Sequence, residues 1–281
     1  MLMEISLITP VYNAAIYLPA LIESVEKQDF TDYEWIICDD GSCDDSWSIL
    51  RKAASTNDRI RLIGQENSGV SSARNACLRQ ISGKYLMFAD ADDTLEPGCL
   101  SALFRQMEES SSDLCIYGWY IHQKDKLFSY VFEKKETEAT NEKLYQMILE
   151  DPYLCGGGYP WNKIWRVSSI TENGSIPGFR ENLSHYEDKL WTLERLDQIG
   201  DPSISWLNRP LYNYYLRGES LSHSMSAEKF IKLGEETIDS LDAIIEYVRH
   251  YHPRASASAE KLRNDRIREI ASVLREAGIT I

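Results

Sequence analysis

The chain has 281 residues, 43% of them hydrophobic, which suits one large α/β domain or one domain with a smaller appendage. Its formal net charge of −14 disfavours a nucleic-acid partner, because an acidic surface repels a polyanion. No run approaches the ~18 apolar residues of a transmembrane segment. The N-terminus lacks the features of a signal peptide, and the six cysteines form no CxxC pair, so we expect a cytoplasmic protein with reduced thiols.

Strand and helix patterns alternate along the first half of the chain. Apolar runs rich in β-branched residues predict strands over Ile5–Val11, Glu34–Cys38, Ile60–Ile63, Tyr85–Ala89 and Asp113–Gly118. Helical spacing predicts helices over Tyr17–Gln28, Ser46–Ala54 and Gly69–Ile81, and Pro97 suits the first turn of another. This alternation predicts an α/β fold with a mostly parallel sheet that is flanked by helices.

The second half of the chain is less regular. Ser184 and Glu187 form a candidate capping box ahead of a helix that extends through Leu196. From about Ser226 onward the pattern is helical, and a last helix is expected over about Ser258–Ala277.

Three acids crowd the end of the predicted strand Tyr85–Ala89, at Asp90, Asp92 and Asp93. Like charges this close repel each other, and a divalent cation relieves that repulsion. Oxygen ligands favour Mg²⁺ or Mn²⁺, which typically also bind substrate phosphates. The alternative is a solvated acidic turn that caps the next helix, and from these residues alone the two interpretations are equally good.

Two further acidic pairs have both a chemical and a structural interpretation. At Asp39-Asp40, a carboxylate can accept the ring N–H of uracil, or the pair can shape a turn, and an acid pair there also suits a receiver domain. A receiver domain leaves Asp90–Asp93 without a role. Asp188 follows Glu187 near the positive end of a helix, which favours the ionised form that a general base needs. The alternative is an ordinary first-turn acid.

In this order and spacing, the motifs resemble family 2 glycosyltransferases with the GT-A fold. They are Ile5–Asn13, Asp39–Ser42, Asn67–Asn75, Asp90–Asp93, Trp161–Lys163 and Glu187-Asp188, and the resemblance covers residues 4 to about 222. It implies a Rossmann-like sheet and an inverting transfer of one sugar from a nucleotide diphosphate sugar, with Mn²⁺ or Mg²⁺ as cofactor. Processive synthases of the family carry membrane helices and a Gln-x-x-Arg-Trp motif, and this chain has neither, which favours one sugar per encounter.

The resemblance also assigns roles to individual residues. Asp188 is the expected catalytic base, and Asp92 is the expected metal ligand, with His223 as a further candidate. Asp40 is expected to accept a hydrogen bond from the uracil ring, while Asp39 is expected to be structural. The remaining donor-binding candidates are Pro10, Val11 and Tyr12 around the base, Arg74 near the nucleotide or diphosphate, and Asp90, Ala91 and Asp93 around the ribose, metal and donor sugar. The stretch 214–217 resembles a flexible loop that closes over the diphosphate.

The resemblance divides the chain into a GT-A domain over residues 1–225 and a helical C-terminal region over 226–281. Within the domain, 1–118 is the expected nucleotide-binding half and 119–225 the acceptor-binding half. The expected acceptor is a glycan or lipid-linked glycan in bacterial surface glycan assembly, at the inner face of the membrane.

Residues 249–276 contain seven Arg or Lys and four acids. They predict either peripheral docking on anionic lipid or packing on the catalytic domain or on the second subunit of a homodimer, and we prefer packing.

Two other functions compete with this prediction. A sugar nucleotidyltransferase normally has a Gly-rich basic loop near its N-terminus, whereas Ile8–Ala15 contains no Gly, Lys or Arg. A non-catalytic member that only binds a nucleotide sugar is disfavoured by the presence of Asp92 and Asp188.

Overall fold

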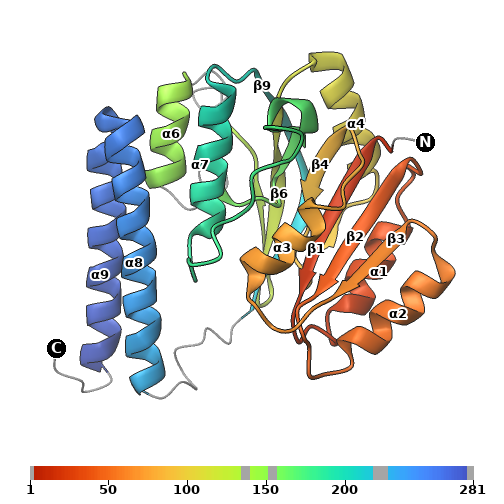
Figure 1. The fold of residues 1–281 in the computed structure, drawn as a ribbon, viewed down its shortest axis with the longest axis horizontal. Helices are drawn as coiled ribbons and strands as arrows, with labels where there is room; N and C mark the ends of the chain where they lie inside the picture. The colour runs from red at the N-terminus through yellow and green to blue at the C-terminus, as the bar shows by residue number, and fades with distance from the viewer. Residues whose placement is uncertain (1–2, 134–139, 151–156, 218–226, 277–281) are drawn as a thin grey trace.

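The structure is a computed structural model that describes residues 3–133, 140–150, 157–217 and 227–276 (Figure 1). A central sheet is flanked by helices. Helices α6 and α7 lie between this sheet and a hairpin of two long helices, α8 and α9 (Figure 1). The expected α/β architecture with a helical C-terminal region is therefore confirmed.

The N-terminal part of the sheet is parallel, with strand order β3-β2-β1-β4. Its strands and connecting helices are β1 (Ile5–Val11), α1 (Leu18–Glu26), β2 (Tyr33–Asp39), α2 (Ser46–Thr56), β3 (Ile60–Gly64), α3 (Val70–Leu78) and β4 (Tyr85–Phe88). Every residue of β2 and β4 is buried, as expected for parallel strands that are covered on both faces. Val11 pairs with Asp39, so β1 and β2 end side by side.

The sheet continues from β4 through an antiparallel strand, β8 (Lys163–Arg166), to β6 (Leu114–Gln123). Next to β6 lies β9 (Ile204–Leu216), which runs parallel to it, and then the two-residue strand β5 (Thr94–Leu95). A further strand, β7 (Lys126–Tyr130), pairs with β6. The mostly parallel sheet is confirmed, and a single sheet runs through both expected halves of the domain.

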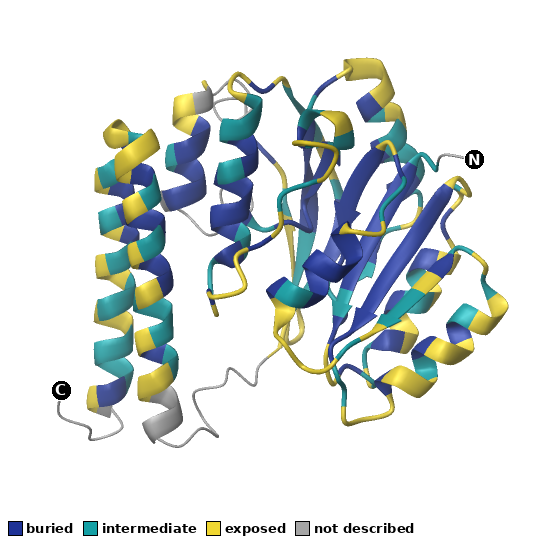
Figure 2. Ribbon diagram, viewed as in Figure 1, coloured by how far each residue is buried: buried dark blue, intermediate teal, exposed yellow. Residues whose placement is uncertain are grey.

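Large aromatic side chains fill the core between the sheet and its helices. Figure 2 shows the central strands β1, β2 and β4 and the sheet-facing sides of the helices as largely buried. The fully buried rings include Trp35, Trp119, Trp161, Trp165 and Trp191. Trp161 stacks on Tyr212 with ring centroids 4.8 Å apart, so the expected Trp161–Lys163 motif is part of the core beside β9.

The remaining helices are α4 (Cys99–Ser110), α6 (Asn141–Glu150), α7 (Glu187–Ile199), α8 (Ala227–Tyr251) and α9 (Ser256–Glu276), with short 3₁₀ turns at Val167–Ser169 and Pro253–Ala255. Asp197 of α7 attaches the α8–α9 hairpin to the domain. Its carboxylate accepts hydrogen bonds from the hydroxyls of Tyr145 and Tyr247 and lies 2.6 Å from Nε2 of His252. One carboxylate thus joins α6, α7, α8 and the turn before α9.

The basic segment at the C-terminus forms part of this hairpin. Leu262 and Leu274 are buried, and Arg263 donates to Asp242 on α8 at 3.1 Å. These two residues of the apolar stripe of α9 therefore pack within the fold, as the preferred interpretation expects, while membrane contact stays a prediction. Among the described residues, each helix is too short or too polar to cross a bilayer.

Candidate functional site

The ends of β1 and β2 bring the first two expected site segments together. The backbone N–H of Asp40 donates to the carbonyl of Val11 at 2.8 Å. Val11 and Asp40 are buried, Pro10 is half-buried, and Tyr12 is 51% exposed. An exposed ring beside a buried strand end is available to stack on a planar ligand.

Asp40 has a structural task of its own. Its carboxylate accepts hydrogen bonds from Nε2 of Gln65 at 2.7 Å and from the backbone N–H groups of Ser68 at 2.9 Å and Gly69 at 2.8 Å. It therefore holds the loop that leads into α3. Gly41 lies against the same loop with φ +72°, and a Cβ there would come within 2.7 Å of the amide nitrogen of Asn67, so only glycine fits.

Asp39 retains an oxygen that the described residues do not use. Its Oδ1 accepts from the backbone N–H of Ser42 at 2.9 Å, whereas Oδ2 is buried and has no hydrogen-bond partner among the described residues. A buried carboxylate oxygen normally has a partner. Both acids therefore remain candidates to accept a hydrogen bond from a base, although the sequence pointed to Asp40 alone.

The acidic turn Asp90–Asp93 is tied to β9 by its last residue. Asp93 is 2% exposed and accepts from the hydroxyl of Tyr212 and the backbone N–H of Tyr215, both at 2.9 Å. The Tyr212 hydroxyl also accepts from the backbone N–H of Asp90 at 2.9 Å. Burial, together with the charges of Asp90 and Asp92, raises the pKa of Asp93 well above its ordinary value. Asp93 thus anchors the turn.

Asp90 and Asp92 are the acids of this turn that remain accessible to a ligand. The Asp92 carboxylate is half-buried and has no side-chain hydrogen bond to a described residue, while buried Ala91 precedes it. Burial raises the pKa of Asp90, and the nearby charge of Asp92 adds to this effect. Arg217 donates from Nη2 to the backbone carbonyl of Asp92 at 2.5 Å.

The donor set of this turn can be compared with the needs of a divalent ion. Within the described ranges, no group of three His, Cys, Asp or Glu side chains could enclose a metal. Mg²⁺ and related ions are usually held by one or two carboxylates together with substrate phosphates, and Asp90 and Asp92 fit that pattern. His223 lies outside the described residues.

The aromatic stretch 214–217, which follows the expected catalytic base Asp188 in the chain, is more regular than expected. Tyr214, Tyr215 and Leu216 belong to strand β9, so the prediction of a flexible loop is wrong for these residues, and its continuation through Ser220, Ser222 and His223 lies outside the described residues. Pairing with β6 along its whole end explains the difference, because it satisfies the backbone groups of these residues. Arg217 follows directly and stacks its guanidinium on Tyr17, 4.2 Å from the ring centroid.

Arg74 joins the acidic turn to the start of α7. It is 5% exposed, and its Nη1 lies 2.6 Å from Oε1 of Glu187, while its Nη2 lies 3.5 Å from Oδ1 of Asp90. The guanidinium also lies 5.2 Å from the ring centroid of Phe179. Arg74 thus joins Asp90 of the acidic turn to Glu187, the neighbour of the expected base Asp188.

The predicted capping box at Ser184 and Glu187 is wrong. Helix α7 begins after Tyr186, whose φ of 56° is left-handed, and no side chain caps it. Glu187 is buried and pairs with Arg74, 113 residues away in the sequence. This tertiary ion pair replaces the local hydrogen bond that the sequence suggested.

Asp188 carries a carboxylate that titrates near neutrality. Burial, and then the negative charge of Glu187, raise its pKa to about 7, although Arg74 acts in the opposite direction. The expectation that the helix end favours the ionised form is therefore wrong, because burial outweighs it. Its Oδ1 accepts from the backbone N–H of Lys189 at 2.7 Å. A base with a pKa near the working pH is well matched to proton transfer.

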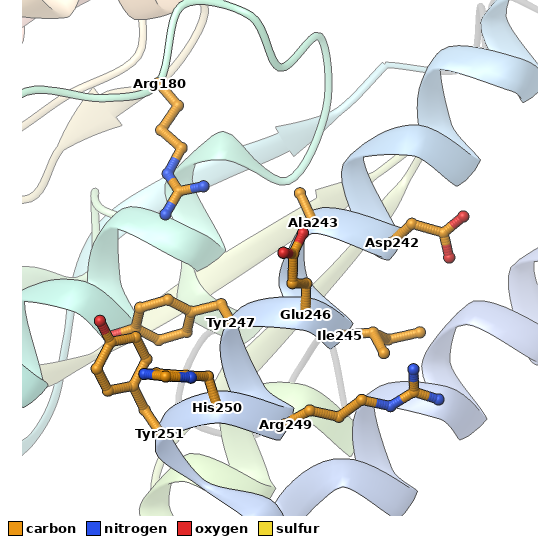
Figure 3. Close-up of a pocket in the computed structure, with 9 residues that line it drawn as sticks. All are labelled: Arg180, Asp242, Ala243, Ile245, Glu246, Tyr247, Arg249, His250 and Tyr251. Carbon is orange, nitrogen blue, oxygen red and sulfur yellow. The ribbon is translucent and has the colours of Figure 1, made fainter.

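Two pockets lie along the α8 helix. One, of about 580 Å³, lies beside Asp188 and is lined by α7, α8, α9 and the residues before α7. We call it the α7 pocket. The larger, of about 730 Å³, is lined by Arg180 and by one stretch of α8 that includes Tyr247, His250 and Tyr251 (Figure 3). It shares no lining residue with the acidic turn or with the α7 pocket.

Comparison with known sequences identifies the family. The family model described as "Glycosyl transferase family 2" matches residues 6–172. The chain belongs to glycosyltransferase family 2. A chondroitin synthase of Escherichia coli is 29% identical over 242 residues, which cover 84% of this chain and 33% of that protein. For three curated relatives, the chain spans 62%, 31% and 33% of their lengths.

Solved structures share the fold of this chain. TarS 1–349 of S. aureus in complex with UDP-GlcNAc has a TM-score of 0.65 at 19% identity, covering 98% of this chain and 92% of that chain. The mannosyltransferase PcManGT of Pyrobaculum calidifontis, in complex with GDP-Man and Mn²⁺, has a TM-score of 0.58 at 13% identity, covering 98% and 79%. At these identities the likeness establishes the fold, and the expected GT-A fold is confirmed.

Some features of the site were not visible in the sequence. The sequence assigned Glu187 to a helix cap and did not show its ion pair with Arg74. The sequence signal for a role in the site was that Glu187 directly precedes Asp188. The contribution of α8 and α9 to the pocket beside Asp188 had no signal, because helical spacing alone does not show which surface a helix covers.

Proposed function

We propose that this family 2 glycosyltransferase transfers one sugar from a nucleotide diphosphate sugar, with UDP as the expected nucleotide, to an acceptor hydroxyl with inversion. The observation that carries the proposal is the chain of contacts from Asp90 through Arg74 to Glu187, which adjoins Asp188. It joins acids suited to a metal–diphosphate to a carboxylate suited to proton abstraction. The fold similarity to a structure in complex with UDP-GlcNAc supports a nucleotide-sugar donor.

In this mechanism the nucleobase of the nucleotide-sugar donor lies at the ends of β1 and β2. It stacks on Tyr12, against Pro10 and Val11, with a carboxylate of the Asp39-Asp40 pair as hydrogen-bond acceptor. Asp90 and Asp92 would hold a divalent ion, Mn²⁺ or Mg²⁺, which when bound stabilises the charge that develops on the departing diphosphate. Asp93 and Arg217 keep the backbone of the turn in place.

Asp188 acts on the acceptor. Its ionised carboxylate accepts the proton of the acceptor hydroxyl as that oxygen bonds to the anomeric carbon and the bond to the diphosphate breaks. Arg74 holds Glu187 beside it and limits the rise in the pKa of Asp188. Direct displacement inverts the anomeric centre and needs no covalent intermediate with the enzyme.

The wider setting is part of the same proposal. The chondroitin synthase relative is named for polysaccharide synthesis, which supports a role in bacterial surface glycan assembly with a glycan or lipid-linked glycan as acceptor. Three further points stay predictions. They are the division of the chain into regions at residues 118 and 225, a cytoplasmic location with peripheral membrane contact, and a homodimer.

A donor screen tests the proposal. Nucleotide sugars are ranked by thermal stabilisation with and without Mn²⁺, because a bound ligand raises the unfolding temperature. Donor turnover is then measured for the parent, for Asp188→Asn and for Asp239→Asn, an exposed acid on α8 that serves as control. We expect Asp188→Asn to keep donor binding and to lose transfer by about a hundredfold or more.

Three results would refute parts of this proposal. Parental transfer by Asp188→Asn would assign the base elsewhere. Nucleotide-sugar binding without any turnover by the parent would indicate a non-catalytic member. Turnover of a nucleoside triphosphate with a sugar phosphate would indicate a nucleotidyltransferase.

A further inference from the structure

The α7 pocket has a polar end and an apolar end. The polar end contains Glu187 and Asp188 at the start of α7, together with Ser184 and His185 just before it. The apolar end is formed by the α8–α9 hairpin. Leu233, Gly234, Thr237, Ile270 and Val273 line the pocket there, and the ion-paired Arg266 and Glu269 of α9 line it as well. A volume of about 580 Å³ lies within the range of ~300–1,000 Å³ that is common for small-molecule sites.

The polar end contains a group with no partner. Nε2 of His185 is buried and makes no hydrogen bond with any described residue. Buried polar atoms normally have a hydrogen-bond partner, so this nitrogen is available to a ligand that enters the pocket. It lies three positions before Asp188 in the chain, and both residues line the same pocket. A ligand hydroxyl directed at Asp188 would find a second polar partner nearby.

The charges around the pocket are largely balanced by one another. Glu187 is paired with buried Arg74 at 2.6 Å, and Glu269 is paired with Arg266 at 2.5 Å. The Arg266 guanidinium also lies 6.0 Å from the ring centroid of Tyr186. Arg266, the arginine of the lining, is therefore already paired, while Asp188 can still become negative. An anionic ligand group would be repelled here.

The other end offers apolar surface. Leu233, Ile270 and Val273 are half-buried and face a pocket rather than the core. Gly234 allows α9 to approach, since a Cβ there would lie 3.1 Å from Cγ2 of Ile270. Ligand burial against such side chains is favourable in proportion to the apolar area that leaves water.

We propose that the α7 pocket is the acceptor site and that it takes a neutral sugar attached to an apolar group. The sugar hydroxyl lies at Asp188 and His185, and the apolar group lies against Leu233, Ile270 and Val273. This inference rests on the proposed function for the role of Asp188. It also moves part of the acceptor site from residues 119–225, where the sequence placed it, to the helical C-terminal region.

Alkyl glycosides test the pocket without knowledge of the natural acceptor. Binding of octyl β-D-glucopyranoside and octyl β-D-galactopyranoside, below their micelle concentrations, is compared with that of the methyl glycosides, octyl sulfate and octylamine by saturation-transfer NMR and calorimetry. We expect at least one octyl glycoside to bind at least tenfold more tightly than its methyl counterpart and than octyl sulfate.

Two variants and a matched control locate the binding. Val273→Trp on α9 and Leu233→Trp on α8 fill the pocket from different helices, and each should weaken octyl glycoside binding at least tenfold. Ile231→Trp, an exposed apolar position on α8 that does not line the pocket, should change it less than twofold. The unfolding midpoint of each variant shows whether it folds.

The outcomes separate this inference from the proposed function. Affinity for UDP with Mn²⁺, measured on the same variants, should be unchanged. Any of four results would overturn the inference. They are equal binding of methyl and octyl glycosides, tighter binding of octyl sulfate or octylamine, unchanged binding by both folded Trp variants, and no glycoside binding at all. If the parent binds the glycosides as expected but neither binds nor turns over any nucleotide sugar, the pocket remains a glycoside-binding site and the proposed function is refuted.

Discussion

Arg74 is the residue whose removal should affect stability most clearly. In Arg74→Met, a side chain of similar length loses the cation that lies 2.6 Å from Glu187 and 3.5 Å from Asp90. Both Arg74 and Glu187 are less than 10% exposed, so water cannot replace the lost partner. Breaking a buried ion pair on one side costs about 3–5 kcal/mol, because it leaves an uncompensated charge, and we expect a loss of that size in the free energy of unfolding.

Urea denaturation of a double-mutant cycle tests this reasoning. Arg74→Met combined with Glu187→Gln removes both charges, so the double variant should be more stable than Arg74→Met alone. Arg180→Met is the matched control, because Arg180 also lies 2.6 Å from a glutamate, Glu194, but is 44% exposed. An exposed pair of this kind contributes about 1 kcal/mol or less. Additive effects in the cycle, or equal losses in Arg74→Met and Arg180→Met, would refute the argument.

Three further predictions concern the base, the acidic turn and the hairpin. Because burial raises the pKa of Asp188 from its ordinary value of 3.8 to about 7, kcat/KM should increase as the pH rises through 7; a kcat/KM that is constant from pH 6 to 8 would contradict this. The stability that the protonated form contributes should be lost as the pH rises from about 4 to about 7. Asp92→Ala should abolish the Mn²⁺-dependent part of UDP affinity in calorimetry without lowering the unfolding midpoint, because it relieves carboxylate repulsion; unchanged Mn²⁺ dependence would remove Asp92 from the metal site. Asp197→Asn should lower the free energy of unfolding by about 2 kcal/mol, because the bonds to Tyr145, Tyr247 and His252 lose a charged acceptor, and amide exchange near His252 should become faster; unaltered exchange there would mean that the hairpin is held by other contacts.

The first half of the fold was predictable because its central strands β1, β2 and β4 are buried on both faces. Continuous apolar runs such as Ile5–Val11 leave little choice of structure, and the acids that follow them had to lie at one sheet edge. Strand β8 was not predictable. Its four residues pair with β4 and β6, far apart in the chain, and a short apolar run does not show which partners it will find.

The candidate site was predictable as a set of residues but not as a set of contacts. Glu187 fitted a local capping pattern, yet its partner lies on α3. Asp40 looked available to a ligand, yet three donors from one loop already surround it. For Glu187 a tertiary contact took the place of the local role, whereas for Asp40 the loop contacts come in addition to the expected contact with the base. Sequence spacing carries no information about contacts over such separations.

The acidic turn is fixed to the sheet at both ends, by β4 before Asp90 and by β5, paired with β9, after Asp93. A segment that is clamped in this way cannot spread to reduce the repulsion among its own carboxylates. The cost of gathering them is therefore incurred when the protein folds, and the cation proposed for this turn would meet ligands that are already assembled. In that case the turn would be preorganised: it would exchange some stability of the empty protein for a site that needs little rearrangement when it is occupied.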